Sequence, residues 1–229
     1  NLLLSHERIQ IGARTFYQCS SLTEIVIPSH ITSIGENAFE NCTSLQHVII
    51  PPSVTSIGIR AFVGCSSLTE VSLPDSITTI ENNAFAGCSS LTTINIPSDI
   101  SEIKDYTFKD CVSLSEIEIP KAVVSIGIGA FRGCLKIESI VLPSSIEMIK
   151  DNTFRDCSGL LEIEISSSLL SIGKFAFCSC TSLSKVTIPN GTKTIEESAF
   201  LESTSLNEIT IPESVSVIGN SAFKDCKVL

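Results

Sequence analysis

The fold of this chain is decided by a stretch of 23 residues, Leu91-Thr-Thr-Ile-Asn-Ile-Pro-Ser-Asp-Ile-Ser-Glu-Ile-Lys-Asp-Tyr-Thr-Phe-Lys-Asp-Cys-Val-Ser113. Variants of this stretch fill the sequence about ten times over, with no insertion or deletion between them. One phenylalanine marks each copy, and these residues follow one another every 23 positions: Phe16, Phe39, Phe62, Phe85, Phe108, Phe131, Phe154, Phe177, Phe200 and Phe223. A period of about 20 to 50 residues is typical of solenoids, in which each unit packs mainly on its neighbours.

The first part of each copy predicts a β-strand. The consensus is L-x-x-I-x-I-P-x-x-I-x-x-I-G-x-x-A-F-x-x-C-x-S, and its start alternates with period two, as at Ile94 and Ile96. This alternation indicates a short strand with one buried face. Proline ends the strand in most copies, because it has no N–H for the ladder. Ser5 and Ser166 replace this proline in two copies. Since every copy runs the same way, we expect the strands to stack in parallel.

The second part of each copy returns the chain around the core. A pair of apolar residues three apart, such as Ile77 and Ile80, predicts a bend, at which glycine such as Gly35 is frequent. The segment that ends in Ala84-Phe-Ala-Gly-Cys88 then predicts one helical or 3₁₀ turn, too short to be stable alone. Each copy should therefore form one coil made of a strand, a bend and a tight turn.

Cysteine forms a column of its own in the repeat. Nine of the ten cysteines stand three residues after the phenylalanine: Cys19, Cys42, Cys65, Cys88, Cys111, Cys134, Cys157, Cys180 and Cys226. Stacked side chains point the same way, whereas a disulfide needs Cβ atoms that face each other. We therefore expect buried free thiols that act as small hydrophobic groups, with Ser203 in the column's remaining position. Cys178 stands where Lys109 and Arg132 stand in other copies, so we expect it to be the most exposed and reactive thiol.

The pattern L-x-x-I-x-I-P followed by I-x-x-I-G-x-x-A-F-x-x-C resembles the BspA-like, or Treponema pallidum-type, class of leucine-rich repeats. The resemblance extends over essentially the whole chain. It implies a leucine-rich-repeat solenoid, a curved right-handed coil of about ten 23-residue repeats, with the strands in a concave parallel β-sheet and helical or 3₁₀ turns on the other faces. It also implies a cell-surface or secreted protein used in adhesion and the binding of host or matrix proteins. The family has no fixed catalytic or ligand residue to transfer. The departures from its pattern are Ser166 for proline, Thr192 for isoleucine, and Glu81, Lys104, Lys150 and Glu196 for glycine.

Charge and length exclude several classes of partner. Lysine and arginine number 15 against 25 acidic residues, a formal net charge of -10. Nucleic acids and anionic membrane surfaces are bound through lysine and arginine, so neither is expected as a partner. No apolar stretch approaches the roughly 20 residues that cross a bilayer, so we expect no membrane insertion. The sequence begins and stops inside repeats without polar caps, which suggests that residues 1–229 form a single solenoid domain from a longer array.

If the alternate isoleucines of each strand point inward, two columns of residues face outward. The first column is Glu24, His47, Glu70, Thr93, Glu116, Ser139, Glu162, Lys185 and Glu208. Glutamate occupies every second coil, at intervals of about 9.6 Å. Such a stripe predicts a surface that meets a basic or polar partner, or simply a solvated face. Glu118 and Glu164 lie on the same face as Glu116 and Glu162, but Ca²⁺ needs oxygens at about 2.3–2.6 Å. We expect no metal and no cofactor.

The second outward column is Leu3, Val26, Ile49, Ser72, Asn95, Glu118, Val141, Glu164, Thr187 and Thr210. Its first three members are apolar and adjacent, with His47 beside them. Exposed apolar patches often mark partner sites, so this end of the sheet is the best single candidate for one. The alternative is that β-branched residues stand there because they favour strands.

The sequence contains no enzyme signature. His6, His30 and His47 stand in different columns without the spacing of metal ligands, and the serines of the turns have no repeated histidine or aspartate beside them. We therefore expect a non-enzymatic protein-binding or adhesion module that uses the concave sheet. The alternative is a structural spacer or a rod that associates end to end, and a size that grows with concentration in light scattering would favour the rod.

Overall fold

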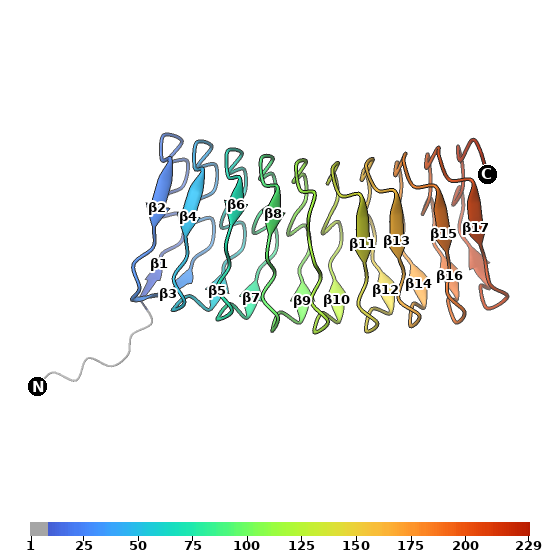
Figure 1. The fold of residues 1–229 in the computed structure, drawn as a ribbon, viewed down its shortest axis with the longest axis horizontal. Coiled ribbons are helices and arrows are strands. Elements are labelled where there is room, and N and C mark those ends of the chain that lie inside the picture. The colour runs from blue at the N-terminus through green and yellow to red at the C-terminus, as the bar shows by residue number, and fades with distance from the viewer. Residues whose placement is uncertain (1–8) are drawn as a thin grey trace, which may run out of the picture.

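The 23-residue copies form coils that stack in sequence order along one long axis (Figure 1). The computed structural model describes residues 9–229. Their arrangement is a solenoid of parallel strands, which confirms the fold predicted from the period. Leu3, one of the predicted partner-binding residues, lies outside the described residues.

The predicted strands form one long side of the solenoid, which we call the strand face. They are β2 (Glu24–Val26), β4 (His47–Ile49), β6 (Glu70–Val71), β8 (Thr93–Ile94), β11 (Ser139–Val141), β13 (Glu162–Glu164), β15 (Lys185–Thr187) and β17 (Glu208–Thr210). These strands pair two by two, as β2-β4, β6-β8, β11-β13 and β15-β17. The pairs are parallel with a register of one repeat, as in the pair of Ile25 with Val48. The coil of residues 116–119 forms only an isolated bridge, from Glu116 to Thr93.

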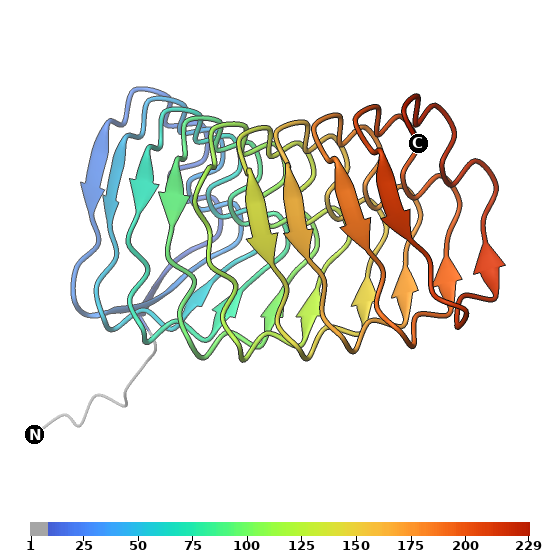
Figure 2. The same ribbon diagram turned by 45° about the vertical axis from the view of Figure 1, so that its right-hand side comes forward.

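A second set of parallel strands lines another side of the coils, where the sequence had predicted only a bend (Figure 2). Its short strands are β1 (Ile9–Ile11), β3 (Ile31–Ile34), β5 (Ser56–Ile57), β7 (Thr79–Ile80), β9 (Glu102–Ile103), β10 (Ser125–Ile126), β12 (Met148–Ile149), β14 (Ser171–Ile172), β16 (Thr194–Ile195) and β18 (Val217–Ile218). They pair in three short sheets, β1-β3-β5-β7, β9-β10 and β12-β14-β16-β18, which together we call the second sheet. Most of these strands have two residues, which is too short for an alternating pattern to appear in the sequence.

At Gly35 and Gly58, after the second strand, the neighbouring coil leaves no room for a Cβ atom. A Cβ atom at Gly35 would lie 2.6 Å from the carbonyl oxygen of Ile11, and one at Gly58 would lie 2.7 Å from the carbonyl carbon of Gly35. Neither glycine has a positive φ. Contact between backbones, rather than freedom to bend, therefore explains the residue at these positions.

The segment around each core phenylalanine forms successive hydrogen-bonded β-turns in place of the expected helical or 3₁₀ turn. The Ala38 N–H donates to the Gly35 carbonyl at 3.3 Å, and the Cys42 N–H donates to the Phe39 carbonyl at 3.1 Å. A residue with positive φ precedes each of these donors, namely Asn37 (54°) and Asn41 (59°). A right-handed helix cannot continue through left-handed residues. Residues 9–229 contain no helix, and hence no helical segment that could span a membrane.

The left-handed residues occupy two fixed columns, two positions before and two positions after the phenylalanine. The first column is Arg14, Asn37, Arg60, Asn83, Tyr106, Gly129, Asn152, Phe175, Ser198 and Ser221. The second column is Gln18, Asn41, Gly64, Gly87, Asp110, Gly133, Asp156, Ser179, Glu202 and Asp225. Their N–H groups point along the axis: Asn37 donates to Ile59 O at 2.9 Å and Asn41 to Val63 O at 2.7 Å. Backbone hydrogen bonds therefore join the coils on this side too, which we call the turn face.

The phenylalanines form one continuous stack through the core. Those from Phe39 to Phe200 are fully buried, and the centroids of neighbouring rings lie between 5.0 and 6.0 Å apart. The rings are close to parallel, with interplanar angles of at most 15°. Stacked aromatic pairs contribute about 0.5–1.5 kcal/mol beyond the area they bury. The repeating phenylalanine therefore provides an unbroken line of contact from coil to coil.

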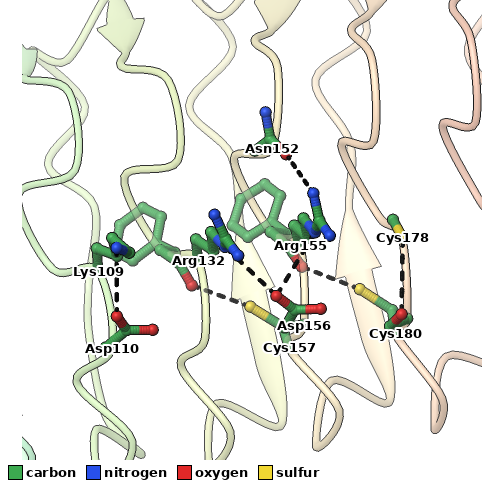
Figure 3. A network of polar contacts seen from close by, with 12 residues as sticks. Lys109, Asp110, Arg132, Asn152, Arg155, Asp156, Cys157, Cys178 and Cys180 are labelled. Carbon is green, nitrogen blue, oxygen red and sulfur yellow. Dashed lines mark hydrogen bonds and ion pairs between the residues drawn. The ribbon is translucent and has the colours of Figure 1, made fainter.

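The cysteine column runs beside this stack as free thiols. Each buried thiol donates a hydrogen bond to the phenylalanine carbonyl of the coil before it, as Cys157 does to Phe131 at 3.1 Å (Figure 3). Ser203 makes the same bond to Phe177 at 2.8 Å. The prediction for Cys178 is wrong, because its side chain is only 3% exposed, whereas Cys19 is exposed. The column thus needs a small side chain that can donate a hydrogen bond.

Two departures from the repeat pattern are accommodated by hydroxyl groups. Ser166 stands in place of proline, is buried, and donates to the Ser144 carbonyl at 3.1 Å. Thr192 stands in place of isoleucine, is fully buried, and donates to the Leu169 carbonyl at 2.9 Å. In both cases a polar side chain enters the core and bonds to the preceding coil, so no buried donor is left without a partner.

Candidate functional site

The apolar candidate patch lies at one end of the strand face. Val26 in β2 and Ile49 in β4 are 66% and 61% exposed, and the two residues are paired in register. His47 is exposed and lies opposite Glu24 in the same ladder. The structure therefore brings four of the predicted residues together on two adjacent strands. Their large exposed fractions leave this apolar surface uncovered within the described chain.

The glutamate stripe also follows the strand face. Its members Glu24, Glu70, Glu116 and Glu162 are all exposed. Within residues 9–229 none of them takes part in an ion pair. The stripe ends at β15 and β17, where Lys185 Nζ lies 2.6 Å from a carboxylate oxygen of Glu208. An uncompensated row of carboxylates thus runs from β2 to β13.

Glu118 and Glu164 are exposed members of the second column, in two different settings. Glu164 belongs to β13 and pairs in register with Val141 of β11, which is 59% exposed. Glu118 lies in the coil without a strand, next to the isolated bridge of Glu116. No pairing joins this coil to β11 in the part of the chain that the structure describes. Glu118 thus borders the break in pairing before β11, and Glu164 borders a second break, between β13 and β15.

Three hollows follow one another along the strand face. The first, of about 620 Å³, extends from His47 to Thr93 and Asn95. The second, of about 470 Å³, shares Thr93 and Asn95 with the first and reaches Glu118. The third, of about 760 Å³, shares Glu118 with the second and reaches Glu164. Because consecutive hollows share lining residues, they form one shallow groove that runs across the strands, along the axis of the solenoid.

Asn95 is exposed, as its outward column predicts, and its side chain also bonds to the neighbouring coil. Its Oδ1 accepts a hydrogen bond from the Leu73 N–H at 2.9 Å, and its Nδ2 donates to the Leu73 carbonyl at 2.7 Å. The amide thus replaces a rung of the backbone ladder between β6 and β8. This bidentate contact holds the side chain against the groove wall.

A charged cluster on the turn face was not predicted as a site, and its groups are paired with one another (Figure 3). Asp156 Oδ2 lies 3.3 Å from Arg132 Nε and 3.6 Å from Arg155 Nε. Arg155 also donates to Asn152 Oδ1 at 3.3 Å and lies over the ring of Phe175. The column of basic residues one position after the phenylalanine was visible in the sequence. Its charges are largely satisfied locally, so it presents little free positive potential to an anion.

Glu40 is a nearly buried carboxylate with a structural role. Its Oε1 lies 2.6 Å from Arg60 Nη2, and its Oε2 accepts a hydrogen bond from the Asn37 amide. The hydrogen bond from Arg60 lowers the pKa of Glu40, against the opposing effect of burial. Asn37 and Glu40 thus link two coils on the turn face through Arg60.

The cysteine column offers little nucleophilic chemistry. Burial raises the pKa of the Cys42 thiol to about 11 and that of Cys111 to about 12. Thiols react as thiolates, so these groups are inert near neutral pH. Among residues 9–229 no group of three or more histidine, cysteine or acidic side chains is arranged to hold a metal ion.

Comparisons with known proteins agree on one kind of relative. A sequence profile described as the BspA type leucine-rich repeat region (6 copies) matches residues 9–134 and 101–229. A leucine-rich cell surface protein of Faecalibacterium prausnitzii A2-165 is 28% identical, with 96% of this chain and 81% of that chain covered and a TM-score of 0.54. The Treponema pallidum leucine-rich repeat protein is 28% identical, with coverage of 76% and 71% and a TM-score of 0.51. The pneumococcal vaccine antigen PcpA is 25% identical, with coverage of 86% and 58% and a TM-score of 0.60. None of the curated proteins matches the chain.

Proposed function

This chain belongs to the BspA-type leucine-rich repeat family, and from that premise we propose that it is a non-enzymatic protein-binding or adhesion module. It acts as part of a cell-surface or secreted protein. Its partner is another protein, which it binds through the strand face.

The location is supported by the proteins to which the chain is similar. The Faecalibacterium prausnitzii relative is described as a cell surface protein, and the pneumococcal relative is described as a vaccine antigen. Both share the solenoid with this chain at TM-scores above 0.5. A solenoid offers a long continuous surface, which suits the binding of an extended or large partner.

The strand face is chosen over the turn face because the two differ in exposed apolar surface and in unpaired charge. On the strand face, Val26 and Ile49 expose more than half of their surface, and Glu70 and Glu116 take part in no ion pair within residues 9–229. On the turn face, charged groups such as Asp156 are paired with their neighbours. Unpaired charge beside exposed apolar surface is what a partner can use.

Two observations support the proposal that the module is non-enzymatic. Leucine-rich-repeat solenoids of this kind are generally non-enzymatic. The buried thiols of the cysteine column have a raised pKa because of their burial, as at Cys111. Binding, rather than bond breaking, is therefore the activity that the described surface supports.

The proposal is tested with two matched double variants. Val26→Glu with Ile49→Lys places opposite charges in the apolar patch of the strand face. Val124→Glu with Met148→Lys makes the same change at two exposed apolar residues of the second sheet, which are 56% and 51% exposed. The immobilised chain is exposed to serum and extracellular-matrix proteins, and each retained protein is purified and its affinity measured by surface plasmon resonance.

We expect a partner whose affinity falls at least tenfold with the strand-face variant and is unchanged with the second-sheet variant. Circular dichroism should show that both variants are folded. Equal affinity for both variants and the unchanged chain would contradict binding through the strand face. A chain that retains no protein from either mixture would count against the proposal as well.

A further inference from the structure

We propose that the groove of the strand face binds a basic polypeptide segment in the polyproline II conformation, with lysine or arginine at every third residue. The inference rests on the proposed function and names the chemistry of the partner segment. Three observations carry it: the direction of the groove, its charge, and the spacing of that charge.

The direction of the groove selects an extended segment that crosses the strands. The three hollows share lining residues in sequence, from His47 through Thr93 to Glu164, so the groove runs along the axis of the solenoid. Residues of both outward columns line the first two hollows, and the members of the two columns on one strand are about 6.6–6.8 Å apart. The third hollow extends from the second column to Lys121 and Ser167. An α-helix with its side chains is about 10–12 Å wide, so it would rest on the rims. A single extended chain is narrow enough to enter.

The charge of the groove selects a basic segment. Four glutamates line the three hollows, namely Glu70, Glu116, Glu118 and Glu164, against one lysine, Lys121, at the third hollow. Glu162 continues the first outward column on the same face. No lysine or arginine occupies either outward column between β2 and β13. The carboxylates are exposed and take part in no ion pair of residues 9–229. Each carboxylate attracts a cationic partner electrostatically, and the net charge of -10 also favours the approach of such a partner.

The spacing of the charge selects the conformation. Glutamates of the first column recur every second coil. This interval is about 9.4–9.8 Å from Glu24 to Glu70 and from Glu70 to Glu116, where every step between coils is a paired strand or a bridge. A polyproline II helix has three residues per turn and a rise of about 3.1 Å, so every third residue returns to one side after about 9.3 Å. A β-strand returns to one side after about 6.6–6.8 Å, and an α-helix after about 5.4 Å. Only the polyproline II repeat places one cation at each glutamate over several turns.

The side chains between the glutamates fit the remaining two residues of each turn. Thr93 and Ser139 are members of the first column between the acidic coils. Their hydroxyl groups can hydrogen-bond to the main chain of the bound segment, which has no internal hydrogen bonds in the polyproline II conformation. Ile49 and Val141, both exposed, offer apolar contact from the second column. Proline rings would pack on these aliphatic groups, and a proline-rich segment loses little entropy when it is bound.

The experiment uses two peptides with the same composition. The first is four repeats of Lys-Pro-Pro, and the second has four consecutive lysines followed by eight prolines. Both carry a fluorophore, and their affinity for the folded chain is measured by fluorescence anisotropy at low salt. The double variant Glu116→Gln with Glu162→Gln is compared with Glu36→Gln and Glu147→Gln, two exposed glutamates outside the strand face that cause the same change of charge.

We expect the spaced peptide to bind at least threefold more tightly than the clustered peptide. Loss of Glu116 and Glu162 should weaken the spaced peptide by about three- to tenfold, as for two exposed ion pairs, and the control variant should change it less than twofold. Binding should also fall as ionic strength rises from about 0.01 M to about 1 M, because the Debye length shrinks from about 30 Å to about 3 Å.

Equal affinity for the two peptides would overturn the inference, because it would show attraction by charge without spacing. Equal weakening by the two double variants would overturn it too, and so would the absence of binding at millimolar peptide. Failure of this inference can be distinguished from failure of the proposed function. A protein partner that is lost with Val26→Glu and Ile49→Lys but kept with Glu116→Gln and Glu162→Gln would retain the binding face and reject the basic segment.

Discussion

The thiol of Cys157 lies 3.1 Å from the carbonyl oxygen of Phe131, one coil earlier, and donates a hydrogen bond to it (Figure 3). The same contact recurs down the column, and Ser203 makes it with a hydroxyl. The cysteine of the repeat is therefore selected for its size and its donor, and the pairing joins the two most regular columns of the core.

Replacement of Cys157 separates these two contributions. Cys157→Ser keeps a donor in the same place and should change the free energy of unfolding by less than about 1 kcal/mol. Cys157→Ala removes the donor and part of the volume, and should cost about 1–2 kcal/mol. Urea denaturation measures both. A cost for serine equal to that for alanine would show that the hydrogen bond contributes nothing.

Phe108→Ala tests the aromatic stack. Phe108 is fully buried between the rings of Phe85 and Phe131, at centroid distances of 6.0 and 5.6 Å. Its removal should cost about 3–5 kcal/mol as a core cavity. Phe175 lies outside the stack and is partly exposed, so Phe175→Ala is the matched control and should cost clearly less. Similar losses of unfolding free energy for both variants would contradict the role of the stack.

The left-handed columns make a prediction about backbone strain. Asn83 has a φ of 58°, a conformation that asparagine and glycine tolerate better than alanine. Asn83→Gly should therefore leave the free energy of unfolding nearly unchanged, whereas Asn83→Ala should lower it by about 1 kcal/mol. Thermal unfolding of the two variants in parallel provides the measurement. An alanine variant more stable than the unchanged chain would contradict a left-handed backbone conformation at residue 83 in solution.

The sign of a pH effect follows from Glu40. Its pKa is lowered from the ordinary value of 4.5, chiefly by the hydrogen bond from Arg60. A lowered pKa in the folded state contributes stability above the unfolded pKa, and this contribution is lost as pH falls through the folded value. The unchanged chain should thus lose more stability than Glu40→Gln between pH 5 and strongly acidic solution. Urea denaturation midpoints of both proteins measured across this pH range provide the test. Equal dependence of the midpoint on pH in the two proteins would show that Glu40 does not contribute to the acid sensitivity of the fold.

The sequence period was sufficient to predict the stack and the strand face, because a repeat without insertions places equal positions on top of one another. Ile94 and Phe108 needed no structural information to be assigned to the core. The outward positions of Val26 and Glu116 followed from alternation along a strand. The repeat pattern of the sequence was therefore sufficient to predict most of the fold.

Other features needed contacts that a consensus does not contain. The second sheet was missed because two-residue strands such as Thr79–Ile80 have no alternation to detect. The columns of asparagine, aspartate and glycine around the phenylalanine indicated left-handed turns, but Arg60 and Phe175 at the same positions obscured them. Cys178 was expected to be exposed because long basic residues share its column. Those residues keep their stems along the surface, and a short side chain at that depth lies beneath its neighbours.

The proposed binding face needs a measurement that reports location as well as affinity. The most direct is the NMR spectrum of the ¹⁵N-labelled chain during titration with the four-repeat Lys-Pro-Pro peptide. Binding in the groove should concentrate the changes in amide chemical shift along it, at Thr93, Glu116, Ser139 and their neighbours, and leave the turn face around Asp156 unchanged. Shifts that concentrate around Asp156, or that spread evenly over all faces of the solenoid, would contradict the claim that the strand face is the binding surface.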